Sequence, residues 1–294
     1  MAQPAPSTLP LEIEREIFEQ AAYTDPLCVP KLMLVAWRVK IWVEPFLYRI
    51  LMLEDTTWDT TAKCYPLVDD PGLSRASTIP PHIFKNSVRN LWLNWLPHDV
   101  AEYFISAATG VENLWVSIRF NPTGSLLHAI GSVSPKRLHT YLHDLLALED
   151  LLTLPILSRL THIEVLSAST DKHAEIWQVV AQIRTLTHLA FHEDDSEFLD
   201  LCPSLLGACT TLRVLLYITD PHDFESGEDF PVLCDLREDL RFVQMRHEDD
   251  ARDWRTGALT GVDFWSRADD FIAKHQSGEI NKLQYVMEED STKE

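Results

Sequence analysis

The chain has 294 residues, of which 46% are hydrophobic, and this length and composition predict one large folded domain or two smaller ones. Its 25 basic and 45 acidic residues give a net charge of 25 − 45 = −20, which disfavours nucleic acid as a partner because phosphates bind Lys and Arg. The five cysteines form no C-x-x-C pair, the N-terminus lacks a signal-peptide pattern, and no apolar run is long enough to span a membrane. We therefore expect a cytoplasmic or nuclear protein that has no contact with the membrane and no zinc site.

Three short apolar segments open the chain and predict a small helical bundle. In the first, "LPLEIEREIFEQ" (9–20), Pro10 suits the first position of a helix, and Ile13 and Ile17 lie one turn apart on one face. The other two segments are "PKLMLVAWRV" (30–39) and "VKIWVEPFLYRI" (39–50). A bundle of about 40 residues has too small a core to be robust alone, so it is expected to need a partner surface in its own chain or another.

Seven short apolar strings after residue 87 share the pattern of a leucine-rich repeat. Their fourth residues are Leu91, Leu114, Leu138, Ile163, Leu189, Leu215 and Val243, so the successive spacings are 23, 24, 25, 26, 26 and 28 residues. These spacings fall in the range of about 20–29 residues that is typical of such repeats. We predict that each string is a strand, that the strands are parallel on the concave face of an arc, and that helices return along its convex face.

The segments between the strings have apolar residues at helical spacing. Helices are predicted in "HDVAEYFISAAT" (98–109), "KHAEIWQVVAQI" (172–183) and "VDFWSRADDFIAKHQSG" (262–278), the last ending at Gly278. An earlier strand is predicted in "YRILML" (48–53), and a helix near 81–86. The tail, 279–294, carries seven charges in 16 residues and is expected to be disordered. The alternative is a doubly wound α/β domain, which the even spacing and the lack of a glycine-rich phosphate loop disfavour.

The opening segments "LPLEIEREIF", "LMLVAWRVKIW" and "EPFLYRIL" resemble the F-box. With the repeats behind them, the layout resembles F-box/leucine-rich-repeat proteins, and in particular the F-box-like proteins abundant in mushroom-forming fungi. The resemblance implies an α/β chain with a three-helix module at 8–53 and an irregular solenoid at 54–278, and it implies the substrate-recognition subunit of a cullin-based ubiquitin ligase. The residues that it implies for contact with a Skp-type adaptor are Leu9, Pro10, Ile13, Ile17, Val35, Val39 and Pro45.

Two other functions remain open. The helices can instead cap the open edge of the solenoid, which would make the chain a protein-interaction scaffold. Independently of this, Ile13 and Ile17 can belong to the core of the small bundle itself. An acidic α/β enzyme is the more distant alternative, because the chain lacks the G-x-S-x-G, G-x-G-x-x-G, Walker and H-E-x-x-H motifs. We therefore expect no catalytic residue, no cofactor and no metal.

Aromatic residues occupy the predicted concave face of the first three repeats, where adjacent strands lie about 4.8 Å apart. Because Trp and Tyr are enriched in binding hot spots, these residues are predicted to contact an unknown target protein. The predicted contact residues are Trp92, Trp115, His139 and Tyr141. The next row along the strands consists of Asn94, Ser117, Tyr141, His192, Ile218 and Arg246. The alternative is that the helical bundle or the proline-rich segment before residue 81 covers the tryptophans.

Two acidic runs, "HEDDSE" (192–197) and "HEDD" (247–250), each begin with a histidine where a predicted strand ends. Both are therefore expected on one rim of the arc. They are compatible with a metal ion or a basic peptide, but such runs are more often solvated loops, and we prefer that interpretation.

Overall fold

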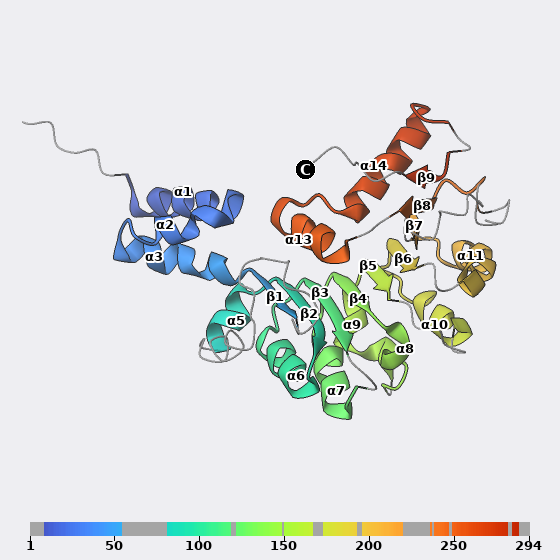
Figure 1. The fold of residues 1–294 in the computed structure, drawn as a ribbon, viewed down its shortest axis with the longest axis horizontal. Coiled ribbons are helices and arrows are strands. Elements are labelled where there is room, and N and C mark those ends of the chain that lie inside the picture. Colours follow the sequence, from blue (N-terminus) through green and yellow to red (C-terminus); the bar gives the residue numbers. More distant parts are fainter. Residues whose placement is uncertain are drawn as a thin grey trace, which may run out of the picture.

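A computed structural model describes residues 9–54, 81–118, 122–148, 150–166, 173–192, 196–219, 236, 238–246, 249–281 and 284–287. It contains an N-terminal helical module followed by alternating strands and helices that build one parallel sheet (Figure 1). The predicted α/β class is confirmed, and the strand–helix alternation follows the pattern of leucine-rich repeats. The proline-rich segment 55–80 lies outside the described residues.

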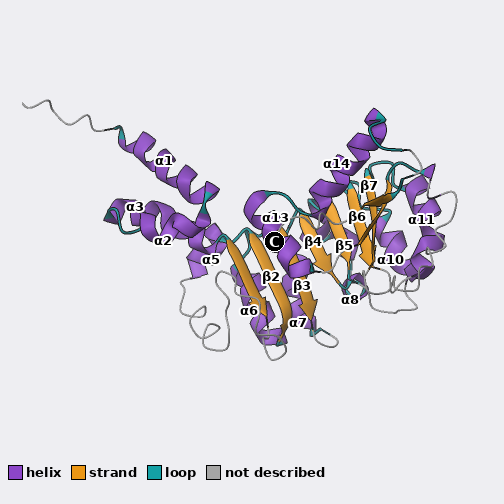
Figure 2. Ribbon diagram, turned by 45° about the horizontal axis from the view of Figure 1, so that its top comes forward, coloured by secondary structure: helices purple, strands orange, loops and turns teal. Residues whose placement is uncertain are grey.

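The helical module has a small core of its own. It comprises α1 (Leu11–Thr24), α2 (Val29–Leu32) and α3 (Trp37–Val43), with short 3-10 turns η1 (Pro26–Cys28) and η2 (Glu44–Tyr48). Ala22, Val29, Val39 and Val43 are fully buried among these elements. The module projects from one edge of the sheet (Figure 2), and η2 joins it to the sheet because Tyr48 packs against the main core. The predicted helical region is thus confirmed, but its second segment (30–39) is not one helix: it contains the end of α2, a turn and the start of α3.

In the described part of the chain, nine parallel strands follow one another across the sheet in sequence order. They are β1 (Ile50–Glu54), β2 (Asn90–Leu96), β3 (Asn113–Ile118), β4 (Arg137–Thr140), β5 (His162–Val165), β6 (His188–His192), β7 (Val214–Thr219), β8 (Phe242–Arg246) and β9 (Val286–Met287). The register pairs in succession Leu51, Leu91, Leu114, Leu138, Ile163, Leu189 and Leu215. The repeat spacing predicted from the sequence is therefore the spacing of the strands.

The last predicted repeat is wrong by one residue. Leu215 pairs with Phe242, whereas Val243 pairs with Leu216 and packs in the apolar cluster on the opposite face. The pattern "FVQM" has apolar residues on both faces, so it lacks the alternation that fixes the phase of a half-buried strand. A one-residue shift exchanges the faces of every side chain in the strand.

Helices cover both faces of the sheet, and most of them lie on the predicted convex face (Figure 1). These are α5 (Pro81–Ser87), α6 (His98–Ala107), α7 (Gly124–Ser132), α8 (Leu142–Leu145), α9 (Pro155–Ser158), α10 (His173–Val180) and α11 (Ser196–Ala208). They enclose the main core, in which Leu91 and Leu114 from the strands meet Phe104 and Ile130 from the helices. The predicted helices at 98–109 and 172–183 are confirmed as α6 and α10.

The C-terminal part departs from prediction in two ways. Helices α13 (Asp250–Thr260) and α14 (Phe264–Ser277) lie on the face expected to be open, although 262–278 was predicted as a convex return. Helical spacing identifies the apolar side of α14, but both faces of this sheet are apolar, so the pattern does not say which face it covers. The tail, expected to be disordered, contributes Val286–Met287 as β9, which pairs with β8; residues after 287 lie outside the described part.

Candidate functional site

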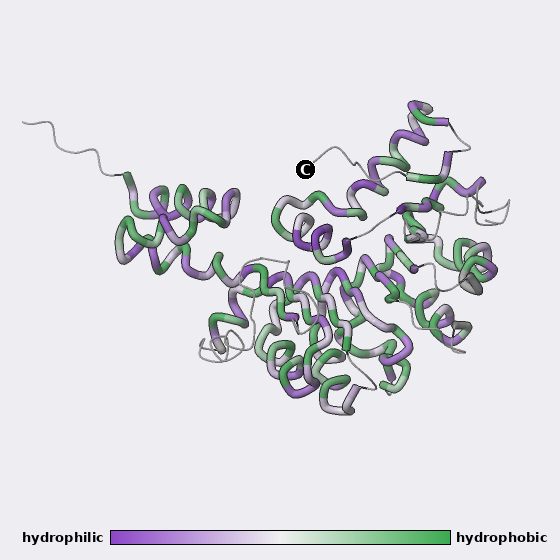
Figure 3. The backbone as a smooth tube through the Cα atoms, viewed as in Figure 1, coloured by the Kyte–Doolittle hydropathy of each residue, from purple (hydrophilic) through white to green (hydrophobic). Residues whose placement is uncertain are grey.

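The helical module carries most of the exposed apolar side chains. Of the sixteen large hydrophobic residues that are exposed in the described part, ten lie between residues 9 and 41, so the module concentrates them. They are Leu9, Leu11, Ile13, Ile17, Tyr23, Leu27, Leu34, Val35, Trp37 and Ile41, and we call them the apolar surface of the module. Figure 3 shows hydrophobic segments in this module as well as along the sheet. Clusters of exposed apolar residues often mark sites of interaction with another protein.

An ion pair connects the two helices that carry much of this surface. Arg38 Nη2 on α3 lies 2.7 Å from Glu14 Oε1 on α1. Ile17 is one turn beyond Glu14, Ile41 is one turn beyond Arg38, and both isoleucines are exposed. The core side of α1 is formed instead by Phe18 and Ala22. The division between core and surface that sequence periodicity leaves open is thus resolved for α1.

Six of the seven residues that the F-box resemblance implies for adaptor contact are exposed. They are Leu9, Pro10, Ile13, Ile17, Val35 and Pro45. The expectation is wrong for Val39, which is fully buried against Ala22, Val29 and Val43. Val35 lies in the turn before α3, whereas Val39 lies on the inner side of that helix, so their four-residue spacing does not place them on one surface.

The predicted aromatic ladder exists in the sheet, but it is buried. The Trp92 and Trp115 rings stack with centroids 4.0 Å apart, and the His139 ring stacks on Trp115 at 5.1 Å. Only 2% of Trp92 and 5% of Trp115 is exposed, and His139 is likewise buried. The edge of Trp254 from α13 meets Trp92 at 5.4 Å.

The expectation that Trp92, Trp115 and His139 are exposed for target contact is therefore wrong. The alternative, that they are covered, holds, but α13 and α14 form the cover in place of the helical bundle or the segment before residue 81. These helices come about 150 residues later in the chain, and a repeat pattern read locally carries no information on such long-range contacts. Tyr141 remains half-buried at the end of the ladder.

A buried carboxylate organises the strand ends beside the ladder. Glu164 is fully buried; His139 Nδ1 donates to one of its oxygens, and His192 Nε2 lies 2.7 Å from the other. Burial alone would raise the pKa of Glu164, but His139 and His192 outweigh it and lower the pKa to about 2. The other ring nitrogen of His139 lies 3.1 Å from Asn113 Oδ1. Glu164 is thus an ionised group that fixes the orientation of two histidines.

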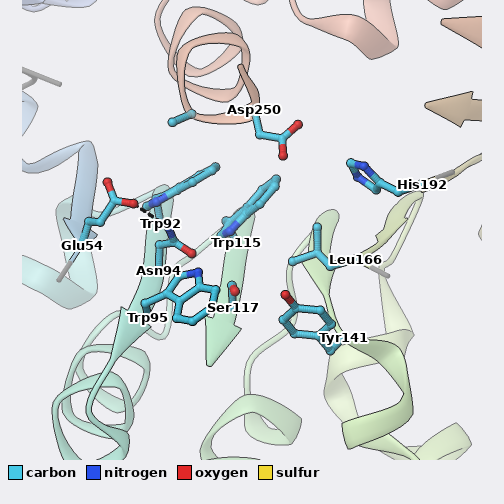
Figure 4. Close-up of a pocket in the computed structure, with 11 residues that line it drawn as sticks. Glu54, Trp92, Asn94, Trp95, Trp115, Ser117, Tyr141, Leu166, His192 and Asp250 are labelled. Atoms are coloured by element: carbon cyan, nitrogen blue, oxygen red, sulfur yellow. Dashed lines mark hydrogen bonds between the residues drawn. The ribbon is translucent and has the colours of Figure 1, made fainter. Parts of the chain in front are cut away.

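An open pocket of about 360 Å³ lies at the carboxyl ends of the strands, next to the start of α13 (Figure 4). We call it the strand-end pocket; its lining residues are Glu54, Trp92, Asn94, Trp95, Trp115, Ser117, Tyr141, Leu166, His192, Asp250 and Ala251. Four members of the second row predicted from the sequence (Asn94, Ser117, Tyr141 and His192) line it. In parallel α/β sheets, this edge is where ligands usually bind.

Sequence reasoning missed Glu54 and Trp95 in the lining, and it named Asp250 only as part of an acidic run. Glu54 ends the first strand, Asp250 begins α13, and Trp95 lies at an irregularity in β2. No local sequence pattern therefore predicts that these residues meet at one pocket. The expectation that the two acidic runs meet on one rim is supported at His192 and Asp250, which line the same pocket. Suitable atoms of Glu164, His192 and Asp250 lie within 4.8 Å of one another, so these residues are the ones in the described part that have the geometry to ligate a cation.

Comparison with models of protein families gives no match, and comparison with curated proteins gives no significant similarity. Among the described helices, none combines the length and the apolar character required to cross a membrane. The fold is established by the strand register, and the function has to be argued from the two surfaces above: the apolar surface of the module and the strand-end pocket.

Proposed function

We propose that this chain is the substrate-recognition subunit of a cullin-based ubiquitin ligase. In this proposal the helical module binds a Skp-type adaptor, and the repeat sheet holds the target protein. The chain contributes no catalytic group; it accelerates transfer by raising the effective concentration of the target near the ligase. The observation that carries the proposal is the concentration of exposed apolar side chains on α1–α3.

The apolar surface of the module is difficult to explain without a partner. Leu34 and Trp37 are among the most exposed large hydrophobic residues in the described part, at 86% and 73%. A module whose own buried core consists of Ala22, Val29, Val39 and Val43 has little capacity to bury them as well. Covering this surface with a second protein removes apolar area from water, which is the main favourable term in protein association.

The scaffold alternative predicts that the same apolar residues are buried against the sheet. A cap on the open edge of a solenoid would bury its apolar side against the first strand. The module does touch the sheet, but through η2 and Tyr48, while Ile17, Trp37 and Ile41 stay exposed. Capping therefore accounts for η2 and leaves the apolar surface of α1 and α3 without a role.

The test is copurification of the full chain with a recombinant Skp-type adaptor, followed by titration calorimetry. Ile17→Ser and Trp37→Ala should each weaken binding by about tenfold or more, as expected for hot-spot residues. Leu152→Ser is the matched control for Ile17→Ser, because Leu152 is exposed to a similar degree but lies in the 3-10 turn η3 (Leu151–Thr153), between strands β4 and β5. A correctly folded chain that shows no adaptor binding would leave the scaffold as the better explanation.

A further inference from the structure

We propose that the strand-end pocket binds an arginine side chain of a partner protein. The inference rests on the proposed function only in identifying that protein as a ubiquitylation target; binding of the guanidinium group follows from the pocket alone. Four aromatic residues and two carboxylates line the pocket, and its described lining contains no Lys or Arg. Aromatic rings beside carboxylates form a site that favours organic cations and disfavours phosphate or carboxylate ligands.

Trp95 is the residue that gives the pocket an accessible aromatic wall. Strand β2 contains a bulge, because Asn94 pairs with Ser117 but the next pair joins Leu96 to Ile118. Trp95 is the extra residue, and its φ of +59° is rare for an aromatic residue. The bulge allows Leu96 to enter the main core and leaves Trp95 beside the pocket with 49% of its surface exposed. Without the bulge, the alternation of the strand would place Trp95 on the side of the main core and Leu96 on the side of the pocket.

Acceptor groups surround the same space. Glu54 is held by the Asn94 amide, whose Nδ2 donates to Glu54 Oε1 at 2.5 Å. Asp250 lies across the pocket from Glu54, with the Trp92 and Trp115 rings between them (Figure 4). Ser117 supplies a hydroxyl group in the lining. Behind this lining, Glu164 is bound through both oxygens by His139 and His192, so it does not face a ligand directly.

Size and shape favour arginine over other cations. At about 360 Å³, the pocket is near the lower end of the range of about 300–1,000 Å³ for ligand sites, so it suits one side chain better than a folded segment. A guanidinium group is planar, stacks on aromatic rings, and offers five donors that can reach carboxylates on two sides. The lysine ammonium is compact and more strongly hydrated, so it would use the ring faces and the separated carboxylates less well.

The experiment titrates the full chain with N-acetyl-arginine N-methylamide and follows the tryptophan indole signals by NMR. The matched probes are the lysine analogue and the citrulline analogue, which has nearly the shape of arginine but no charge. We expect the citrulline analogue to bind at least about tenfold more weakly, and the arginine analogue to weaken as salt screens the pocket. Equal binding of the arginine and citrulline analogues would overturn the proposal.

Variants separate the pocket from the adaptor surface. Trp95→Ala, Glu54→Gln and Asp250→Asn should each reduce binding of the arginine analogue by about fivefold or more, with an unchanged circular dichroism spectrum. Trp37→Ala removes an exposed tryptophan of α3 that does not line the pocket, and it should leave arginine binding unchanged while reducing adaptor binding. If Trp95→Ala and Trp37→Ala have equal effects on arginine binding, the pocket is not the site. Saturable binding of Zn²⁺ or Mn²⁺ to His192 and Asp250, without arginine binding, would overturn the proposal in favour of a metal site.

Discussion

The helical module and the tryptophan ladder of the repeat sheet differ in how far their tryptophans are buried. Trp37 in the module is 73% exposed, whereas Trp92 and Trp115 in the sheet are almost completely buried. The sheet has helices on both faces, and α13 covers its tryptophan ladder. In the module α2 and α3 are short, and the interior is filled by small side chains such as Ala22 and Val29.

Aromatic content alone therefore does not identify a binding surface. The fraction of surface that a unit can bury grows with its size, so apolar residues in a small unit are more often left for a partner. The sequence pattern around Trp92 and Trp115 appeared more suited to recognition than that around Trp37, yet it is Trp37 that is exposed.

Trp115→Ala should lower the free energy of unfolding of the sheet by about 3–5 kcal/mol, because it removes a buried ring that stacks between Trp92 and His139. Trp37→Ala, the same change on an exposed side chain, should change it by less than about 0.5 kcal/mol. Urea unfolding followed by circular dichroism measures both. Similar losses for the two variants would mean that the module and the sheet do not differ in burial as described.

Glu164→Ala should cost about 3 kcal/mol, because it removes the ionised acceptor of two histidines inside the sheet. The matched change is Glu112→Ala: Glu112 Oε2 lies 2.7 Å from Lys136 Nζ, but both side chains are about half exposed. An exposed pair of this kind contributes about 0.5 kcal/mol. The same urea measurement compares the two variants, and equal losses would show that Glu164 is not held as a buried ion.

Much of the sheet could be predicted because its strands repeat. Each repeat needs an aliphatic residue at one inward position, and this requirement produced the even spacing from Leu91 to Leu215, which the register reproduces. The predicted inward position was wrong at Val243, because apolar residues occupy both faces of β8. Local periodicity determines elements and their apolar sides, but it does not determine which layer covers which face.

The candidate site was predictable only where it follows from the repeats. Asn94, Ser117 and Tyr141 lie two residues beyond the ladder positions, and the strand alternation placed them on one row. Trp95 and Asp250 were not predictable in this way. A bulge inserts Trp95 outside the alternation, and a helix from the far end of the chain brings Asp250 to the pocket.

Lowering the pH from 7 to 5 should destabilise the sheet by about 2 kcal/mol through His162 alone. Its pKa is lowered from 6.5 to about 2 by burial and then by the charges of His188 and Arg137. The folded state therefore keeps His162 neutral, while the unfolded chain binds a proton below pH 6.5. The contribution of His162 to the free energy of unfolding is fully present above that pH and is lost as the pH falls from 6.5 towards 2.

Urea unfolding at pH 7, 6 and 5 measures this loss, and His162→Gln should make the curve flatter. The ring of His188, which stacks on His162 with centroids 4.0 Å apart, adds to the effect, since burial also lowers its pKa. Glu164 does not contribute in this window, because its pKa falls from 4.5 to about 2 and its contribution is lost only in more acidic solution. A variant with the same slope as the wild type would show that His162 is not the proton-linked group.

Substitutions on the apolar surface of the module should change the stability of the chain least. Ile13→Ser and Ile17→Ser should each change the free energy of unfolding by less than about 0.5 kcal/mol, because both side chains are already exposed in the folded chain. The same variants should reduce self-association, measured by light scattering at rising concentration, since they remove apolar surface from water. Val39→Ala is the contrasting change, as it empties part of the module's core and should destabilise the module without improving solubility. A loss above about 2 kcal/mol for Ile17→Ser would place Ile17 in a core and remove the reason to expect a partner there.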